Sequence, residues 1–253
     1  MELILLDLDE TLLRSDKTIS DYSIKTLKRC QSAGILVGFC TSRGKVNLLD
    51  WEKQVAPDVV TCNGGARIFH KDNLLHTESF SVEQTQAILA KAYEICGKDC
   101  EITLDTLDNI FWNRGKDKSE VYADWATIDD FSDFSEPALK ICVQTDDPNK
   151  AKQIAQAVKD CDYLPFSDIP WYKFSSGNAT KEHAIKILAK KLNINLAKTI
   201  AFGDDFNDIG MLKLCGRGIA MGNAIEQVKL AADDTTRTNN EDGVAWYLEK
   251  HLL

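Results

Sequence analysis

Short continuous runs of apolar residues alternate along the chain with segments in which apolar residues recur at helical spacing. The first run, Leu3–Leu6, ends at Asp7, which is typical of a parallel strand buried on both faces. Ser20 can cap a helix that continues to Gly34, and residues 35–40 form a second apolar run. This strand–helix–strand pattern predicts the start of an α/β fold with a doubly wound, Rossmann-like parallel sheet.

The pattern continues with a helix over 46–55, a short strand at 59–60 and an Asn-Gly-Gly turn at 63–65 that leads into a hairpin. From about residue 81 the helices and strands are joined by hairpins, which is typical of an α+β domain. Within it we expect helices through Ile88 and Ala92, through Val121 and Trp125, and through Ile154 and Val158, and strands at 101–104, 110–112 and 139–143.

After residue 178 the first pattern returns. We expect a helix over 180–192, strands at 199–202 and 218–221 that are each followed by a helix, and then a last segment over 244–253. The sequence therefore predicts a discontinuous α/β core, formed by 1–80 and 173–253, with an α+β cap domain inserted as 81–172.

Composition narrows the possible partners. The 253 residues include 30 Lys and Arg against 39 Asp and Glu, for a net charge of −9, which disfavours binding to nucleic acid. No apolar run approaches the roughly 18 to 20 residues of a membrane span, and the N-terminus lacks the basic start of a signal peptide. We expect a cytoplasmic protein, a monomer or weak homodimer, without a membrane partner.

The cysteines could suggest a metal site or disulfides. Cys96 and Cys100 are four residues apart, but the four histidines of the chain are scattered and supply no partners for zinc. Most of the eight cysteines lie in or beside apolar runs. We interpret them as reduced core residues.

Two acidic clusters follow predicted strands, where ligands of open parallel sheets bind. Asp7 and Asp9 leave the first strand two residues apart, a pair that on its own also suits a turn. After the strand at 199–202, helical spacing would place Asp204 and Asp208 on one face, and such packed carboxylates repel unless a cation lies among them. Oxygen ligands without Cys or His favour Mg²⁺ over zinc.

Two further clusters suit a phosphate group. The hydroxyl and backbone N–H groups of Thr41 and Ser42, which precede Arg43 at a strand-to-helix turn, can bind an oxyanion or form an ordinary N-cap. Lys181 opens a helix capped by Thr180, where a cation opposes the helix dipole and gains only if it meets an anion. A surface lysine is the alternative.

In order and spacing these motifs resemble the haloacid dehalogenase (HAD) superfamily and, within it, the Cof-type (type IIB) phosphatases, whose cap is inserted between the second and third motifs. Glu10, Ser42 and Glu182 stand where the family usually has Gly, which changes loop geometry but removes no reacting group. The matching segments are 7–12, 41–43, 181 and 203–208, supported by 63–64, 218–223 and 242–245.

The resemblance implies roles for single residues. Asp7 would be the nucleophile that becomes phosphorylated, and Asp9 would be the general acid and base, with a raised pKa. Mg²⁺ would be held by Asp7, by the Asp9 backbone carbonyl and by Asp204, with Asp208 as a direct or outer partner; the role of Asp205 stays open. The groups expected to hold phosphate or substrate are Thr41, Ser42, Arg43, Lys181 and Asn207.

The implied function is a Mg²⁺-dependent phosphatase for a small phosphorylated metabolite, most simply a sugar phosphate. A phosphosugar mutase of the same fold would return the phosphoryl group to the sugar instead of to water. A non-catalytic regulator that binds a phosphometabolite is the alternative from another class, but a binding protein has no need of a nucleophile such as Asp7.

Overall fold

The computed structural model describes residues 1–114, 126–166 and 169–253 and divides them into two compact units. Unit 1 comprises Met1–Thr77 and Thr180–Leu253, and unit 2 comprises Glu78–Ala179. Unit 2 extends beyond the expected insertion of 81–172 because its last strand, β11 (Trp171–Ser176), pairs with two other strands of the same unit. The helix expected at Val121 and Trp125 lies outside the described residues.

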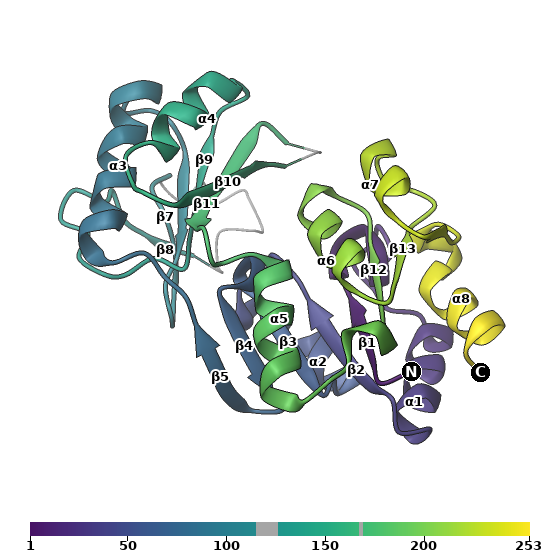
Figure 1. The fold of residues 1–253 in the computed structure, drawn as a ribbon. Coiled ribbons are helices and arrows are strands. Elements are labelled where there is room, and N and C mark those ends of the chain that lie inside the picture. Colours follow the sequence, from purple (N-terminus) through teal and green to yellow (C-terminus); the bar gives the residue numbers. More distant parts are fainter. Residues whose placement is uncertain (115–125, 167–168) are drawn as a thin grey trace. The chain divides into compact units, whose positions relative to one another are not determined.

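Unit 1 is built on a sheet whose order is β14-β13-β12-β1-β2-β3-β4-β5 (Figure 1). Neighbouring strands are parallel from β14 to β3, and β4 and β5 complete the edge as an antiparallel hairpin. The strands are β1 (Leu3–Leu6), β2 (Leu36–Cys40), β3 (Val59–Cys62), β4 (Arg67–His70), β5 (Asn73–Thr77), β12 (Thr199–Gly203), β13 (Arg217–Ala220) and β14 (Asp234–Thr235).

The parallel strands are connected by helices. Crossovers between parallel strands are almost always right-handed. The crossovers from β1 to β3 and those from β12 to β14 run in opposite directions along the sheet, which puts α1 and α2 on one face and α6 and α7 on the other. Helix α8 packs on α1, and α5 packs on α6. The predicted doubly wound α/β core is confirmed. The helices are α1 (Asp21–Ser32), α2 (Leu49–Val55), α5 (Lys181–Leu192), α6 (Ile209–Leu214), α7 (Glu226–Ala231) and α8 (Gly243–His251).

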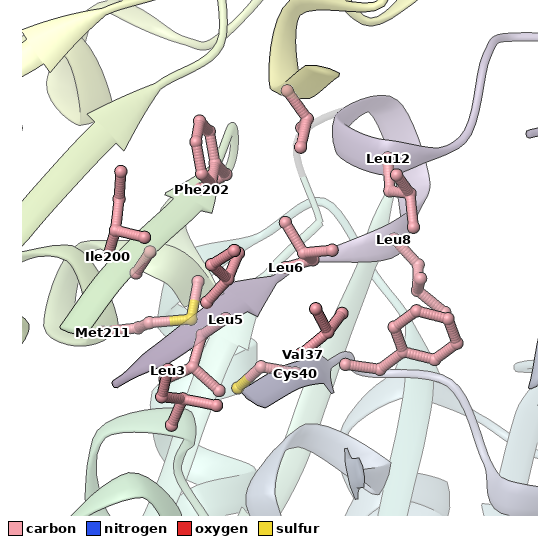
Figure 2. Packing of buried hydrophobic residues seen from close by; sticks show 14 of the residues in the cluster. Leu3, Leu5, Leu6, Leu8, Leu12, Val37, Cys40, Ile200, Phe202 and Met211 are labelled. Carbon is pink, nitrogen blue, oxygen red and sulfur yellow. The ribbon is translucent and has the colours of Figure 1, made fainter. Parts of the chain in front are cut away.

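Strand β1 lies at the centre of this sheet, between β12 and β2. All four of its residues are buried, and their side chains pack with Val37, Ile200, Phe202 and other apolar residues on both faces (Figure 2). Burial on both faces explains why the sequence shows a continuous apolar run and no alternation. Because the strand order reverses beside β1, its carboxyl end is the switch point at which ligands of such sheets bind.

Unit 2 is a six-stranded, mostly antiparallel sheet of order β10-β11-β9-β6-β7-β8, with α3 and α4 packed together over a core that includes Ile88, Ile141 and Phe174. The other strands and the helices are β6 (Ile102–Asp105), β7 (Ile110–Trp112), β8 (Thr127–Ile128), β9 (Lys140–Gln144), β10 (Cys161–Pro165), α3 (Val82–Cys96) and α4 (Pro148–Ala155).

Two of the expectations from composition can be compared with the structure. Within the described ranges, every helix is too short or too polar to cross a membrane. All eight cysteines are free thiols, and most of them are buried. This agrees with their interpretation as reduced core residues.

The turn that follows β3 joins two segments that carry candidate site residues. Asn63, Gly64 and Gly65 all have positive φ, at 52°, 72° and 105°. The Asn63 N–H donates to the carbonyl of Arg43 over 2.7 Å. A Cβ added to Gly65 would lie 2.2 Å from the carbonyl oxygen of Thr180, which caps α5. The missing side chain therefore lets the start of α5 approach the turn.

Gly65→Ala should lower the free energy of unfolding by about 3 kcal/mol. The alanine would hold a strained left-handed backbone conformation, and its Cβ would also push the backbone of Thr180 away. Gly34 is a matched control, since its φ is +81° but nothing lies within 4 Å of an added Cβ. For Gly34→Ala we expect only the conformational part, about 1 kcal/mol. Urea unfolding of both variants measures the difference, and equal losses would contradict this role of Gly65.

Candidate active site

The carboxyl ends of β1 and β12 bring three acidic side chains together. Asp7 directly follows β1, Asp204 directly follows β12, and Asp208 ends a short 3₁₀ helix (Phe206–Asp208). One carboxylate oxygen of each lies within 4.8 Å of those of the other two. The two strands are paired in parallel, so that side chains distant in sequence leave the sheet at one edge.

Lys181 lies between two of these carboxylates. Its Nζ is 2.5 Å from Asp7 Oδ1 and 2.6 Å from Asp208 Oδ1. Burial lowers the pKa of Lys181, but the two carboxylates raise it by more than burial lowers it. The net pKa is therefore raised, and the side chain is an ammonium ion. With only 4% of its surface exposed, Lys181 is not the surface lysine of the alternative interpretation.

The single ammonium leaves the acidic cluster with excess negative charge. Burial is the first cause that raises the pKa of Asp7 and of Asp204. For Asp204 the negative charges of Asp7 and Asp208 raise the pKa further, and a hydrogen bond of 2.7 Å from the Thr11 hydroxyl opposes them. A second cation among these oxygens would relieve the repulsion.

The expected helical placement of Asp204 and Asp208 on one face is wrong. The 3₁₀ helix begins only at Phe206, and Asp208 instead folds back so that its Oδ2 accepts the backbone N–H groups of Asp204, at 2.9 Å, and Asp205, at 3.1 Å. Gly203 permits this return, because a Cβ there would lie 2.4 Å from the Asp208 Cβ. The two carboxylates come together because the Asp208 side chain accepts hydrogen bonds from the backbone that precedes it.

Asp205 has a local structural contact. Its Oδ1 accepts the N–H of Phe206 at 2.7 Å and thereby caps the 3₁₀ helix. The three-residue cluster whose carboxylate oxygens could share a metal ion consists of Asp7, Asp204 and Asp208 and does not include Asp205.

Asp9 is held by two cations. Arg43 binds its carboxylate with two hydrogen bonds, of 2.6 Å from Nε and 2.7 Å from Nη2, and Lys17 Nζ adds a third contact at 3.0 Å. Burial raises the pKa of Asp9, but the hydrogen bonds and charges of Arg43 and Lys17 outweigh it, so the net pKa is lowered. The expected raised pKa is therefore wrong for this arrangement.

The remaining candidates lie in loops at the same edge of the sheet. Thr41 follows β2 and is buried, and its hydroxyl oxygen accepts the N–H of Arg43 at 3.2 Å. Ser42 and Asn207 are partly exposed, in the loops after β2 and β12. Of the five residues expected to hold phosphate or substrate, Lys181 contacts the acidic cluster and Arg43 instead contacts Asp9.

Several contacts of the site were not predicted. Thr11 stands in the first acidic motif, which is a signal that could have suggested its hydrogen bond to Asp204. The turn at Glu10, which has a positive φ of 53°, is held by Asn223 Nδ2, which donates to the Glu10 carbonyl at 2.7 Å. Lys17 belongs to none of the motifs. Its contact with Asp9 depends on a turn that the spacing of residues in the sequence does not predict.

Comparison with known proteins places this geometry in context. A model of the haloacid dehalogenase-like hydrolase family matches residues 4–248. Phosphatase YwpJ of Bacillus subtilis (strain 168) is 29% identical over 294 aligned positions that cover 100% of both chains. From the same organism, the 5-amino-6-(5-phospho-D-ribitylamino)uracil phosphatase YitU is 27% identical, over 99% of this chain and 97% of that protein.

Among solved structures, the HAD subclass IIB sugar phosphatase BT4131 aligns with a TM-score of 0.86 over 99% of this chain and 98% of its own. Its sequence identity is 21%, so this likeness concerns the fold.

Replacing Lys181 with Met removes the ammonium that Asp7 and Asp208 share. We expect the free energy of unfolding to fall by about 3 to 5 kcal/mol near pH ~8. The loss should be smaller near pH ~5, because a buried carboxyl group with a raised pKa takes up a proton in the folded state as the pH falls. Urea unfolding at both pH values, with EDTA present, measures the two losses.

The matched control is Lys186→Met on the same helix, which removes an exposed ion pair with Glu182 and should cost about 0.5 kcal/mol or less. A pH-independent loss for Lys181→Met, or one no larger than that of the control, would show that the buried ammonium does not balance these carboxylates.

Proposed function

This chain belongs to the haloacid dehalogenase-like hydrolase family and is a Cof-type phosphomonoester hydrolase, and from that premise we propose that it hydrolyses a small phosphorylated metabolite with Mg²⁺ through a phosphorylated Asp7. The observation that carries the proposal is the convergence of three carboxylates with one buried ammonium at the ends of adjacent strands. Phosphate esters react slowly, so a catalyst must mainly position groups and neutralise charge.

The acidic cluster suits Mg²⁺ by its chemistry. It offers hard oxygen donors, and its three carboxylates exceed the charge of Lys181. Asp7 and Asp204 would hold the ion together with the Asp9 backbone carbonyl. Both Asp208 oxygens already accept hydrogen bonds, so Asp208 suits an outer role that orients Lys181. Bound there, Mg²⁺ would neutralise negative charge on the phosphoryl oxygens.

Asp7 is the proposed nucleophile. The Lys181 ammonium favours its ionised form, which is the form that can attack phosphorus. Attack forms the bond from an Asp7 oxygen to phosphorus and breaks the bond from phosphorus to the leaving oxygen, which takes a proton. Water then attacks the phosphorus of the acyl phosphate, loses a proton, and releases inorganic phosphate and the free Asp7 carboxylate.

Asp9 is the proposed proton donor and acceptor. It lies two residues beyond Asp7, in the short helical segment Leu8–Leu12 that follows β1. With Arg43 and Lys17 bound it is ionised, the form that accepts a proton from the attacking water. In the first half of the reaction it must instead give a proton to the leaving oxygen, so its contact with Arg43 has to change during the cycle.

The phosphoryl oxygens would be held by Thr41, the Ser42 backbone N–H, Lys181, Asn207 and, once it leaves Asp9, Arg43. These groups come from three separate segments, namely the loop after β2, the start of α5 and the loop after β12. A sugar phosphate or related phosphorylated polyol is the substrate class that we favour, because the names of YitU and BT4131 describe such substrates for proteins of this fold.

Addition of Mg²⁺ should raise the melting temperature of the protein. At about a hundredfold excess over its Kd, the ion should stabilise the fold by about 2.7 kcal/mol. Asp204→Asn should abolish the shift, since it removes a proposed ligand. Asp205→Asn is the matched neighbour, which keeps a capping side chain and should keep the shift. A full shift in Asp204→Asn, or its loss in Asp205→Asn alone, would contradict the proposed ligand set.

A screen for phosphate release over sugar phosphates, nucleotides and cofactor phosphates tests the proposed reaction. We expect turnover of at least one phosphorylated polyol, dependent on Mg²⁺, and loss of all turnover in Asp7→Asn with an unchanged fold by circular dichroism. Asp50→Asn, on the exposed surface of α2, serves as the control and should remain active. Normal turnover in Asp7→Asn would refute the nucleophile, and an isomerised sugar phosphate without free phosphate would indicate a mutase instead.

A further inference from the structure

The position of Asp9 depends on two cations that come from irregular segments. Arg43 lies in the loop between β2 and the 3₁₀ helix that begins at Lys45, and it contacts both Asp9 oxygens. Lys17 lies in the turn that leads towards α1 and contacts Oδ1. Long side chains on loops lose conformational entropy when they are ordered, so further contacts are needed to hold Arg43 and Lys17 in place.

The turn that carries Lys17 is strained. Lys17 has a φ of 63°, a left-handed conformation that is unfavourable for a residue with a Cβ. The turn is closed by hydrogen bonds from the Lys17 N–H to the Arg14 carbonyl, at 2.8 Å, and from the Arg14 N–H to the Thr18 carbonyl, at 3.0 Å. Strained backbone of this kind persists where surrounding contacts over-determine it.

Trp51 contacts both cation-bearing segments. The Arg43 guanidinium lies over its ring, with Cζ 4.9 Å from the ring centroid. The indole Nε1–H donates to the Lys17 carbonyl at 3.0 Å. One side chain therefore stacks on the first cation and hydrogen-bonds the strained residue that carries the second.

The helix that carries Trp51 is itself anchored. Helix α2 ends at Val55, which is fully buried, and Leu48, the residue that precedes the helix, is also buried. Glu52 binds Lys45 at 2.5 Å and ties α2 to the loop that follows Arg43. Trp51 is thus presented from an element whose position the core fixes.

We propose that Trp51 is a positioning residue, which holds Arg43 through its ring and Lys17 through its indole N–H, so that Lys17 keeps Asp9 in place for proton transfer when Arg43 releases it. The inference rests on the proposed function, because it requires Asp9 to exchange a proton with the leaving oxygen. Trp51 also packs partly against the core, so the test must separate positioning from packing.

Two substitutions divide the contacts. Trp51→Phe keeps an aromatic face for Arg43 but removes the donor to Lys17, and Trp51→Leu removes both contacts. The matched control is Trp246→Leu on α8, because Trp246 also lies against cations, with Arg237 Cζ at 4.5 Å and Lys250 Nζ at 4.8 Å, but does not belong to the proposed site. Thermal unfolding of all three variants reports the packing contribution.

The informative readout is the dependence on the leaving group. An aryl phosphate with an acidic phenol leaves with little help from a general acid, whereas an alkyl phosphate needs a well-placed proton donor. We expect Trp51→Leu to lower kcat for an alkyl phosphate by about tenfold to a hundredfold, and for p-nitrophenyl phosphate by about threefold or less, with KM changed little. For Trp51→Phe we expect a kcat for the alkyl phosphate that lies between those of the wild type and Trp51→Leu.

Equal losses of kcat on both substrates, or losses that match those of Trp246→Leu at similar stability, would overturn the positioning role. Asp9→Asn is measured beside these variants. If Asp9→Asn turns over alkyl phosphates normally, the acid–base role in the proposed function fails. If Asp9→Asn is impaired while Trp51→Leu is not, only the inference about Trp51 fails.

Discussion

The ion pairs of Lys181 with Asp7 and Asp208 are the interaction on which the rest of the site depends. The three groups come from the end of β1, the first turn of α5 and the loop after β12, and all three are buried. Removing Lys181 would leave both buried carboxylates without their cation, so the three segments must fold together. With Asp204, three carboxylates lie around this one ammonium, which leaves two negative charges in excess and creates the need for a further cation.

The sheet follows from the sequence because burial on both faces requires continuous apolar runs. This constraint predicted β1, β2 and β12 and therefore the common edge at which Asp7 and Asp204 meet. Other features had no such constraint. The link from Asp208 to the N–H groups before it depends on the missing Cβ of Gly203, which helical spacing does not reveal. Unit 2 continues past residue 172 to Ala179, because both pairing partners of β11 lie in that unit.

Asp9 shows why an expected role does not determine an electrostatic environment. A proton donor needs a pKa near the working pH, but the bidentate contact with Arg43 and the contact with Lys17 favour the carboxylate. Both cations belong to loops whose side-chain partners cannot be deduced from spacing in the sequence. Trp51 contacts both loops, so a residue outside every recognised motif affects the geometry of Asp9, which belongs to the first acidic motif.

The covalent bond that we propose between Asp7 and phosphorus can be tested directly. The direct measurement is to quench the enzyme with acid during turnover, reduce it with borohydride, which converts an aspartyl phosphate to homoserine, and locate the change by peptide mass spectrometry. We expect homoserine at position 7, and only when substrate and Mg²⁺ are both present. Homoserine at position 204 or at another carboxylate, or none during steady turnover, would contradict the proposed bond.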